Sequence, residues 1–488
     1  MNKKARTLSE YVNQAHAEAA PAEPATPSWL PELRALLGEK ALDTGQDAVE
    51  AHSYDVWPVA AKWRNQGKRP FAPDVVVTAT GAEQISTLLR WATERGVPVT
   101  PWGGGSSVTG QPLPTRGGIV LDTTRMNRVI ALDPESLLVK VQAGANGLLL
   151  EKELNVRGYT LNNSPQSLDR STIGGWVGTR EMGQFSSRYG GIEDLAVSYT
   201  VVLPTGEIVE TLDGPRASVG PDLRQLFMGA EGTLGVVTDV TLRIFRLPPF
   251  RLMEALTFDG VEAGLQAMRE IMQAGLRPFL VRFYDRDEAR HAMQDPAFEQ
   301  CVMFLGFEGV EGVARAEYEV AMDLCSKAGG SPIGAAPVEA WMARRYDFST
   351  VENLLAEPGG LAETIEVAHF WDRIFDTYQE LKKALDPFAD EVLGHFSHVY
   401  AHGTSLYIIL LGRAADDARA EQILLEVWDT AMTICLKQGA VISHHHGAGL
   451  ARQPYVDDAL GSSHIVLRRI KEALDPAGIM NPGKLGLE

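Results

Sequence analysis

The sequence predicts a protein that mixes α-helices and β-strands in more than one domain. Strand-like and helix-like segments alternate through the first half of the chain in a β-α-β rhythm, which is α/β in character. The pair Pro248 and Pro249 then ends a long strand-like run, and we place a domain boundary there. The chain has 488 residues, 45% of them hydrophobic, which is enough for two or three domains with cores of their own.

The first 27 residues are rich in alanine, proline and glutamate. This composition predicts a flexible N-terminal arm with no core to join. We therefore expect the first folded domain to cover residues 28–247.

The first domain opens with a short β-branched run at residues 75–78, which predicts a strand. Thr80 and Glu83 have the spacing of a capping box, so a helix should follow them, and Gly96 should end that helix. Residues 97–100 predict a second strand, which leads into a glycine-rich loop.

The mixed pattern continues along the chain. The remaining elements expected in the first domain are a strand at 137–143, a helix at 146–157, a hairpin of 196–203 with 207–211, and a strand at 234–245. Residues 248–445 again mix strands and helices but lack glycine-rich loops, and we interpret them as a cap domain. The last segment, 446–488, contains a predicted helix at 464–474 and a turn-rich end.

Composition argues against several classes of function. The net charge of −18 leaves no visible basic face for a nucleic acid. Three scattered cysteines lack the spacing of metal ligands and fit a reducing compartment. No apolar run reaches the roughly 18 residues of a membrane span and no signal peptide is visible, so we expect a cytoplasmic protein.

Four glycine-rich stretches indicate a site for a large ligand. The first, Pro-Trp-Gly-Gly-Gly-Ser-Ser-Val-Thr at 101–109, can curl so that several backbone N–H groups face one anion, which suits a pyrophosphate. The others lie at 164–178, 190–192 and 229–235. Any one of them could be a structural turn, but four in one domain favour a flat cofactor that needs close backbone approach. None has the spacing of a Rossmann or Walker loop.

Four motifs in this order resemble the vanillyl-alcohol-oxidase (PCMH) type of FAD-binding flavoproteins. They are Pro-Trp-Gly-Gly-Gly-Ser-Ser at 101–107, Asp-Arg-Ser-Thr-Ile-Gly-Gly at 169–175, Gly-Ala-Glu-Gly-Thr-Leu-Gly-Val-Val at 229–237 and Asn-Pro-Gly-Lys at 481–484. The resemblance implies an α+β fold. It consists of a PCMH-type FAD-binding domain of two α+β subdomains at 28–247, an α/β cap domain with substrate residues at 248–445, and a C-terminal segment at 446–488 that returns to the flavin.

The resemblance also assigns the cofactor contacts. It places the pyrophosphate of FAD on Gly103, Gly104, Gly105, Ser106 and Ser107, the flavin ring beside Ser171, Thr172 and Gly175, and the adenosine half at Glu231, Gly232 and Val237. The expected cofactor-binding set is completed by Pro101, Asp169, Gly174, Gly235 and Asn481. Many members attach FAD to a histidine in the first loop, but this chain has Gly105 and Ser106 there, so we expect noncovalent FAD.

Two clusters hold six of the eleven histidines. One spans residues 395–402, and the other is Ser-His-His-His-Gly at 443–447. In an extended strand His444 and His446 would share one face and His445 would take the other. Such residues can ligate a metal, act as a general base or hold an anion, or belong to a hydrogen-bonded polar strand.

The glycolate-oxidase and D-lactate-dehydrogenase branch of this family has Gly-His-x-Gly-Asp-Gly-Asn-Leu-His and Glu-His-Gly motifs. Their two histidines and glutamate hold a divalent metal that binds the hydroxy acid. Aligned by eye, His398, Tyr407 and His445 stand at those three positions. The carboxylate is missing, so we expect no metal ion, and a metal-dependent D-2-hydroxy-acid dehydrogenase is disfavoured.

The alkyldihydroxyacetonephosphate synthase branch resembles this chain more closely, through the Ser-His-His-His-Gly run and the upstream Tyr407. In that branch the tyrosine and the histidines do acid–base work while an alkyl group replaces an acyl group without net redox change. The branch also has a phosphate-binding arginine upstream of Glu-Thr-x-Glu. Here Glu-Thr-Ile-Glu is present at 363–366, but Val351 or a neighbour stands where the arginine should be. The candidate substitutes, unless they are surface residues, are Arg282, Arg344 and Arg345.

The leading interpretation is an FAD-dependent oxidoreductase of the alkyldihydroxyacetonephosphate-synthase-like branch that oxidises an alcohol or a similar small organic substrate. We expect Tyr407 to be an acid–base or hydrogen-bonding residue. His444 and His446 would remove a proton while hydride passes to the flavin N5, and His445 and His398 complete the catalytic set. The alternatives are a true ether-lipid-forming synthase and a flavin-binding protein without catalysis. We expect a small-molecule substrate, no nucleic-acid partner and no integral membrane segment, and we allow for a homodimer.

Overall fold

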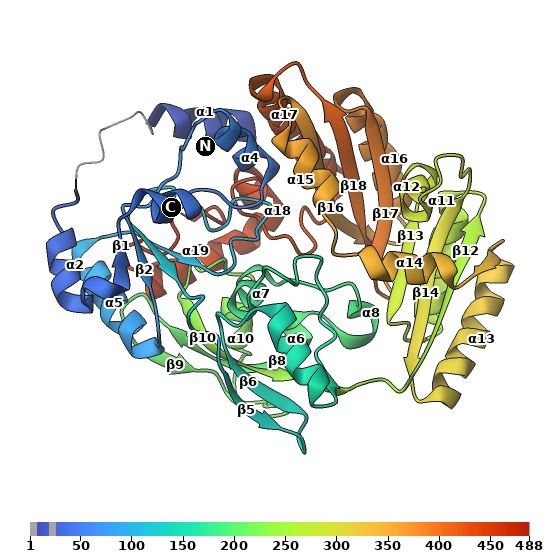
Figure 1. The fold of residues 1–488 in the computed structure, drawn as a ribbon, viewed down its shortest axis with the longest axis horizontal. Helices are drawn as coiled ribbons and strands as arrows, with labels where there is room; N and C mark the ends of the chain where they lie inside the picture. The colour runs from blue at the N-terminus through green and yellow to red at the C-terminus, as the bar shows by residue number, and fades with distance from the viewer. Residues whose placement is uncertain (1–6, 19–25, 488) are drawn as a thin grey trace.

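The chain folds into an N-terminal half with two main β-sheets and a two-stranded one, and a cap half with one large sheet (Figure 1). A computed structural model describes residues 7–18 and 26–487. In Figure 1 the N-terminal half runs from blue to green and the cap half from yellow to orange. The predicted boundary near residue 248 falls just before the first long strand of the cap, β12 (Phe250–Phe258).

The first sheet has the order β1-β2-β4-β3, formed by β1 (Leu42–Asp43), β2 (Val75–Thr78), β4 (Ile119–Asp122) and β3 (Val99–Trp102). β2, β4 and β3 are parallel, and β1 is antiparallel to β2. α5 (Ala82–Arg95) connects β2 to β3 and ends at Gly96, whose φ of 64° is left-handed. This confirms the predicted strand, helix and strand, and it places the first glycine-rich loop after the edge strand β3.

The second sheet is antiparallel and has the order β5-β6-β10-β8-β9, formed by β5 (Val129–Asp133), β6 (Leu138–Gln142), β10 (Val236–Arg243), β8 (Ala196–Val202) and β9 (Ile208–Glu210). The predicted hairpin is β8 with β9. The predicted strand at 234–245 is β10 followed by β11 (Phe245–Arg246), which pairs with β7 (Tyr159–Thr160). The two sheets and their helices give the N-terminal half its two mixed subdomains, as the α+β prediction requires.

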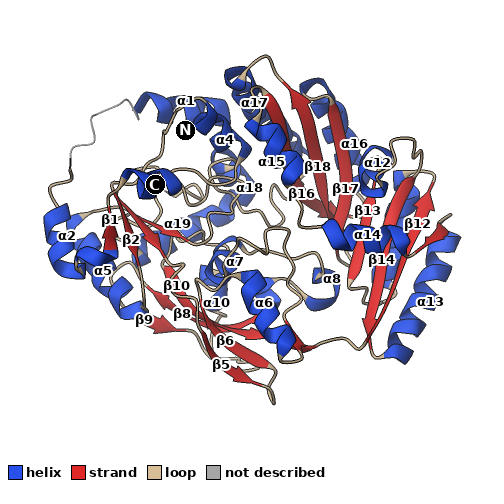
Figure 2. Ribbon diagram, in the orientation of Figure 1, coloured by secondary structure: helices blue, strands red, loops and turns tan. Residues whose placement is uncertain are grey.

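The cap is built on a seven-stranded antiparallel sheet (Figure 2). Its order is β15 (Ser331–Gly334), β12, β14 (Cys301–Gly309), β13 (Leu280–Tyr284), β17 (Glu391–Val399), β18 (Gly403–Arg413) and β16 (Gly360–Phe370). Side chains alternate between its two faces, so Met303 and Phe304 enter different cores. The first core includes residues of α11 (Val261–Gln273), α13 (Glu311–Lys327), α16 (Ile374–Leu385) and α17 (Asp417–Gln438).

The other face of the cap sheet meets the N-terminal half. Its core joins residues of α12 (Arg286–Met293) and α14 (Ala336–Arg344) to Phe185 and Tyr189 at α8 (Ser186–Tyr189).

Apart from α1, which is described below, the remaining α-helices are α2 (Leu30–Leu37), α3 (Gln46–Ala51), α4 (Pro58–Asn65), α6 (Gly147–Val156), α7 (Ile173–Thr179), α9 (Ile192–Leu195), α10 (Arg224–Phe227), α15 (Ser349–Ala356), α18 (Val456–Leu460) and α19 (His464–Leu474). None of the helices in the described part of the chain has the length and apolarity that a membrane crossing requires.

The C-terminal segment leaves the cap and returns to the N-terminal half, where α18 and α19 are red in Figure 1. The Val99 N–H donates to the Ile479 carbonyl, and the Asn481 N–H donates to the Val99 carbonyl, both at 2.9 Å. The end of the chain therefore lies along β3, the strand that carries the first glycine-rich loop.

Residues 7–18 do not form the flexible arm that the composition predicts. They contain α1 (Leu8–Glu18), which packs on α17, and Leu8 and Val12 are fully buried. The Leu8 N–H donates to Asp429 Oδ1 at 2.6 Å. The prediction was wrong here because two apolar residues one helical turn apart are enough to anchor a short helix. The rest of the predicted arm, residues 1–6 and 19–25, lies outside the described residues.

The predicted capping box at the start of α5 is also wrong. Gly81 is the N-cap residue, and it has no side chain that can accept a hydrogen bond. The N–H and the hydroxyl of Thr80 instead donate to Gln84 Oε1 at 2.9 and 3.1 Å. The helix still begins where the sequence predicts.

Candidate functional site

The first glycine-rich loop is pressed against the segment that precedes α7. A Cβ atom on Gly104 would lie 1.8 Å from the Arg170 carbonyl oxygen, and one on Gly103 would lie 2.4 Å from Thr172 Oγ1. Gly105 has a φ of 61°, and a Cβ there would lie 2.5 Å from a neighbouring indole ring. Side chains are excluded at these three positions, so the backbone of the loop forms the surface of the site.

The start of α7 lies beside this loop. Thr172 is the N-cap residue of α7, and its Oγ1 accepts a hydrogen bond from the Gly175 N–H at 3.4 Å. Gly174 packs on Ala143, where an added Cβ would come within 2.8 Å of the methyl carbon. The structure therefore brings together the residues expected at the pyrophosphate and at the flavin ring.

Other predicted residues of this region have different surroundings. Ser171 is buried, and its Oγ accepts a hydrogen bond from Trp176 Nε1 at 2.8 Å. Asp169 is exposed and pairs with the adjacent Arg170 at 3.4 Å. A pocket of about 460 Å³ borders the loop, and its wall includes Gly104, Arg170 and Thr172. There is open space beside the loop where a ligand can enter.

The second half of the first glycine-rich loop is held in place by a buried acid, Asp55. The Gly110 N–H donates to Asp55 Oδ2 at 2.8 Å, and the Val56 N–H donates to the Ser107 carbonyl at 2.9 Å. Burial raises the pKa of Asp55 to about 7. Ser106 comes just before these anchored residues and is partly exposed.

Glu231 has a different role from the adenosine contact that the resemblance assigns. Its carboxylate is buried and accepts hydrogen bonds from the Ala448 N–H at 2.6 Å and the Gly449 N–H at 3.1 Å. Gln111 Nε2 donates to the same carboxylate at 3.3 Å. Because Glu231 is fully engaged by the chain, its side chain fixes residues 447–449 instead of facing a ligand.

The other residues assigned to this motif pack near Glu231. A Cβ on Gly232 would lie 2.8 Å from Pro101, and one on Gly235 would lie 2.8 Å from the second sheet. Val237 belongs to β10. Asn481 Nδ2 donates to the Glu231 carbonyl at 2.6 Å, whereas Asn481 Oδ1 is buried without a partner among the described residues.

These observations fit a cofactor with a pyrophosphate group. The loop offers a glycine backbone with no room for side chains, a helix start and open space beside it. Backbone N–H groups at such a loop are the donors that a pyrophosphate needs.

The histidine run at 443–447 forms an irregular loop and not the extended strand considered from sequence. The guanidinium of the fully buried Arg452 shapes the loop: Nε donates to the Ile442 carbonyl at 2.6 Å and Nη1 donates to the Gly447 carbonyl at 2.8 Å. All three imidazoles therefore lie around one carboxylate, Glu366 on β16.

Glu366 is the charged centre of this loop. It is fully buried and accepts hydrogen bonds from the His445 N–H at 2.6 Å, the Ser443 hydroxyl at 3.2 Å and Arg452 Nη2 at 3.2 Å. Burial acts to raise its pKa, but the interactions with His445 and with the Arg452 guanidinium outweigh burial and hold the pKa well below its usual value. Glu366 is therefore an anion at neutral pH.

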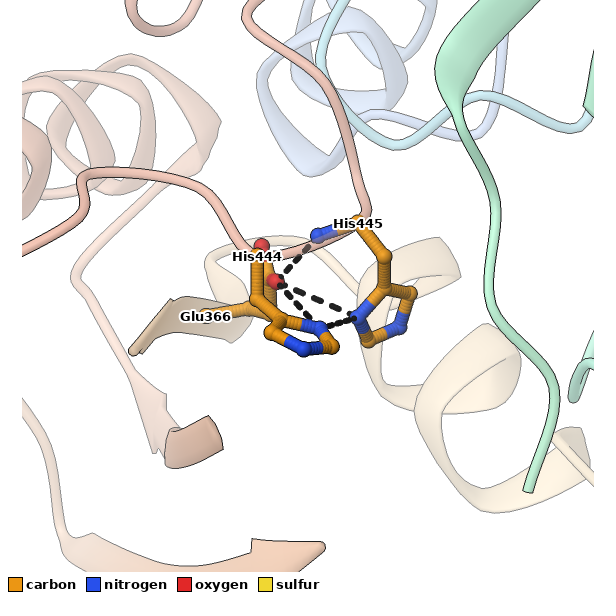
Figure 3. A group of neighbouring side chains, drawn as sticks. All are labelled: Glu366, His444 and His445. Carbon is orange, nitrogen blue, oxygen red and sulfur yellow. Dashed lines mark hydrogen bonds and ion pairs between the residues drawn. The ribbon is translucent and has the colours of Figure 1, made fainter. Parts of the chain in front are cut away.

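His444 and His445 face Glu366 from the loop (Figure 3). Their Nδ1 atoms are 2.8 Å apart, and His445 Nδ1 is 3.2 Å from Glu366 Oε1. Burial, followed by the charge of His445, lowers the pKa of His444 to about 3, so His444 is neutral. Its Nε2 is 2.8 Å from the hydroxyl of Tyr400. The contacts are satisfied if His445 carries a proton on Nδ1 and His444 carries one on Nε2.

Tyr407 meets His445 from the other side. Its hydroxyl is 2.6 Å from His445 Nε2, and its ring stacks on His395 at 4.5 Å between centroids. Burial and the negative charge of Glu366 raise the pKa of Tyr407 well above its usual value. Tyr407 is thus a phenol that donates to His445, and a hydrogen bond and an ion-pair contact join Tyr407, His445 and Glu366 in one line.

His398 and His446 border this line. His398 occupies an irregularity in β17 with a φ of 51°, and its Nδ1 is 2.9 Å from the Ser186 hydroxyl of the N-terminal half. Burial holds the pKa of His398 well below its usual value. Burial lowers the pKa of His446 to about 3, and its Nδ1 has no hydrogen-bond partner among the described residues. Both are neutral imidazoles at the edge of the site.

The argument that this site lacks a carboxylate was wrong. Glu366 supplies one from β16, and its oxygen lies with His444 and His445 nitrogens in a group compact enough for metal ligands. However, the same carboxylate already receives two backbone N–H groups, a hydroxyl and the Arg452 guanidinium. An adjacent buried guanidinium repels a divalent cation, so we keep the prediction that no metal binds here.

The structure separates the three candidate arginines. Arg282 on β13 donates from Nη2 to His395 Nε2 at 2.7 Å, one ring away from Tyr407. Arg345 lies over the ring of Tyr346 at 4.3 Å and donates to that hydroxyl at 2.9 Å. Arg344 donates to the Ala292 carbonyl at the end of α12. Of the three, Arg282 is the one joined to the histidine and tyrosine cluster.

Sequence reasoning missed Glu366, Arg452 and His395 as parts of the site. Glu366 was noted only as a landmark of the Glu-Thr-Ile-Glu motif. An acid inside the apolar strand at 360–370 was the available signal, because a buried carboxylate needs internal donors. His395 lies in the histidine cluster noted at 395–402 but received no role, and Arg452 had no comparable signal, since its partners come from distant strands and loops.

Comparisons with known proteins agree with this geometry. Residues 73–212 match the model of the FAD binding domain, and residues 247–485 match that of the FAD linked oxidases, C-terminal domain. The chain belongs to the FAD-linked oxidases, a family of flavoenzymes, and FAD is its cofactor. The predicted resemblance to the vanillyl-alcohol-oxidase type, on its alkyldihydroxyacetonephosphate-synthase-like branch, is confirmed.

Curated relatives include enzymes of more than one activity. Alkyldihydroxyacetonephosphate synthase of Dictyostelium discoideum is 28% identical over 449 residues, covering 85% of this chain and 73% of the relative. The uncharacterized FAD-linked oxidoreductase YgcU of Escherichia coli K12 is 30% identical over 479 residues, covering 93% and 97%. The mitochondrial D-lactate dehydrogenase [cytochrome] of Arabidopsis thaliana is 30% identical over 428 residues, covering 85% and 73%.

Solved structures show the same fold. An alkyldihydroxyacetonephosphate synthase superposes with a TM-score of 0.78 at 26% identity, covering 94% of this chain and 86% of that chain. Substrate-bound p-cresol methylhydroxylase also gives a TM-score of 0.78, at 16% identity, covering 98% and 97%. The second likeness shows the fold alone.

Proposed function

We propose that this protein is an FAD-dependent oxidoreductase that removes a hydride and a proton from an alcohol or a similar small organic substrate. The observation that carries the proposal is the line from Tyr407 through His445 to Glu366, with contacts of 2.6 and 3.2 Å. This line lies on the face of the cap sheet that meets the N-terminal half, where the glycine-rich loop and α7 are found. FAD, when bound, supplies the two-electron acceptor for the hydride.

In this proposal Tyr407 is the residue that contacts the substrate hydroxyl. The raised pKa keeps Tyr407 in its phenol form at rest. This phenol accepts the substrate proton as it passes its own proton to His445 Nε2. The anionic Glu366 stabilises the imidazolium that forms. The arrangement replaces our expectation that His444 and His446 remove the proton, since burial leaves both with a pKa of about 3.

A second candidate function is that of an alkyldihydroxyacetonephosphate synthase, in which an alkyl group replaces an acyl group without net redox change. The Ser-His-His-His-Gly loop and Tyr407 favour it, as does the similarity to the Dictyostelium enzyme. The same line of residues can give and take a proton in that reaction. Against it stands Val351 on α15, where the resemblance expects an arginine for the phosphate.

Anaerobic mixing of the holoenzyme with alcohols, hydroxy acids and acyl-dihydroxyacetone phosphate separates the two. We expect at least one alcohol or hydroxy acid to bleach the flavin absorption. Exchange of the acyl group for a fatty alcohol without net bleaching would replace the first function by the second. A flavin that no compound perturbs would contradict both.

The same preparation tests how FAD is held. Because the first loop has no histidine, acid precipitation should leave the yellow colour in the supernatant. Yellow protein in the pellet would show a covalent bond and overturn the noncovalent assignment.

A further inference from the structure

Arg282 is a cation near the reacting tyrosine that has no acidic partner of its own. Within the described part of the chain it forms no direct ion pair, and its one hydrogen-bonded nitrogen is Nη2. Its Nε is buried and has no hydrogen-bond partner. A half-buried guanidinium with unused donors is costly unless something else satisfies it.

Two other arginines of the protein have carboxylate partners, whereas Arg344 and Arg345 contact a carbonyl and a tyrosine. Arg452 pairs with Glu366 at 3.2 Å, and Arg251 pairs with Glu308 at 2.5 Å. Each of these arginines is balanced by an acid of the protein itself. Arg282 differs from both, and the missing partner points to an anion from outside the chain.

The guanidinium of Arg282 is fixed in place. Its Nη2 donates to His395 Nε2 at 2.7 Å, and His395 Nδ1 is 2.7 Å from Glu288 Oε1. The rings of Tyr284 and Trp341 lie 5.2 and 5.7 Å from its central carbon. An arginine held on one side in this way presents its remaining donors with little loss of side-chain entropy.

His395 also fixes the position of Arg282 relative to the chemistry. Its ring stacks on Tyr407 at 4.5 Å with an interplanar angle of 15°. The free donors of Arg282 are therefore one aromatic ring away from the phenol that takes the substrate proton.

We infer that Arg282 binds an oxyanion carried by the substrate, a carboxylate or a phosphate, and that His395, held by Glu288, is the positioning residue that aims it. This inference rests on the proposed function and narrows its substrates to alcohols that carry an anionic group close to the reacting carbon. The residue is distinct from the position at Val351 where the resemblance expects a phosphate-binding arginine.

The surroundings of Glu288 give the inference a pH signature. Burial raises the pKa of Glu288 to about 7. The charged or titratable groups around it are Arg282 on β13, Asp285 before α12, His291 on α12, Lys382 on α16 and His395 on β17. As the pH rises through about 7, Glu288 gains a negative charge that faces Arg282 through His395, so oxyanion binding should weaken.

Calorimetric titration of the holoprotein with oxalate and, separately, with inorganic phosphate tests the site. We expect at least one of them to bind, and Arg282→Ala to raise its Kd by about 10-fold or more. Arg282→Lys should raise the Kd by a smaller factor and guards against misfolding of the alanine variant. Arg344→Ala is the matched control and should leave the Kd unchanged. Glu288→Gln should remove the rise of Kd between pH 6 and 8, on either side of the pKa of about 7.

Tighter binding of oxalate identifies a carboxylate substrate, and tighter binding of phosphate identifies a phosphate ester. Failure of both to bind the wild type, or an unchanged Kd in both Arg282 variants, overturns the inference. Flavin bleaching separates this from the proposed function. If a neutral alcohol bleaches the flavin as well as its anionic analogue, the proposed function stands and the inference falls. If oxyanions bind through Arg282 but no alcohol bleaches the flavin, the inference stands and the proposed function falls.

Discussion

At the scale of single residues, the site is organised by one buried anion. Glu366 collects backbone N–H groups, a hydroxyl and the Arg452 guanidinium, and three imidazoles lie around it. The imidazoles are not equivalent. His445 joins Tyr407 to Glu366, whereas burial keeps His444 and His446 neutral. The three imidazoles differ in their positions relative to the carboxylate and to Tyr407.

This difference can be measured. Tyr407→Phe and His445→Gln should each lower the rate of flavin reduction by roughly 10²-fold or more, because each interrupts the same proton transfer. The double variant should be little worse than the worse single variant, since residues of one step are not additive. Stopped-flow absorbance gives the rates, and the flavin content should stay unchanged.

His446→Ala serves as the comparison in the same experiment. It removes an imidazole of the same loop that makes no hydrogen bond to Tyr407, so its effect should be smaller than that of His445→Gln. Independent, multiplicative losses in the Tyr407 and His445 double variant would show that the two residues act in separate steps.

The buried carboxyl group of Glu181 should make the stability of the protein depend on pH. Burial, followed by the charge of Glu193, raises its pKa from the usual 4.5 to about 8, and one oxygen has no partner among the described residues. The folded state keeps a proton that the unfolded state releases, so this stabilisation is complete below about pH 4.5 and is lost as the pH rises through about 8.

The melting temperature of the wild type should therefore fall between pH 5 and 8, across the interval below the folded pKa of about 8. Glu181→Gln, a neutral isostere, should make this fall less steep. Glu319→Gln on the exposed face of α13 is the control and should keep the wild-type slope. Identical slopes in all three proteins would show that Glu181 does not keep its proton on folding.

At the scale of elements, the site depends on loops fixed by contacts that come from elsewhere in the chain. The loop at 101–109 has no room for side chains because it touches the segment before α7. The histidine loop is held by Arg452 from within and by Glu231 of the N-terminal half through the Ala448 N–H. The position of each loop therefore depends on the neighbouring segments that contact it.

Gly104 offers a test of the first loop. Gly104→Ala should strongly lower the FAD content of the purified protein, because the new methyl group would lie 1.8 Å from the Arg170 carbonyl and force the loop away from α7. Gly178→Ala, within α7, is the matched control, since nothing lies within 4 Å of its added Cβ.

The flavin-to-protein absorbance ratio reports the FAD content, and far-UV circular dichroism checks the fold of both variants. Stoichiometric FAD in the Gly104→Ala protein would show that this loop is not the pyrophosphate site.

The elements that were predictable from sequence are those whose signal is local. α5 ends at Gly96, and α19 begins and ends at the predicted residues. These helices were predictable because their apolar periodicity and the residues that end them lie within one short stretch of sequence. The histidine loop was not predictable in the same way. Its shape comes from Arg452 and Glu366, and a consecutive His-His-His run is compatible with a strand until those partners are known.

At the scale of the whole molecule, the two halves are joined at several places. α1 packs on the cap helix α17, and the Lys62 ammonium of α4 contacts Asp417 at 2.9 Å at the start of the same helix. Ser186 reaches His398 across the interface. These long-range contacts carry no local sequence pattern, which is why α1 was mistaken for part of an arm.

The contribution of α1 can be tested through its buried leucine. Leu8→Ala should lower the free energy of unfolding by about 2–5 kcal/mol, the usual cost of emptying a buried leucine site. Leu149→Ala is the control, because Leu149 is 67% exposed and its truncation should change the free energy of unfolding by less than about 0.5 kcal/mol. Urea denaturation measures both. Equal midpoints for the two variants would mean that α1 does not anchor the cap in solution.

The position of residues 479–481 along β3 has a consequence for biosynthesis. The ribosome makes the strand that leads into the first glycine-rich loop early, but it makes the outer neighbour of that strand only after the whole cap. Domains usually fold as they emerge, N-terminal parts first. Here the nascent N-terminal half has an unfinished sheet edge, and it also lacks the Asn481 side chain that donates to Glu231. Capture of FAD is therefore expected to follow synthesis of residues 479–481, so that ribosome-bound intermediates that stop before them remain without the cofactor.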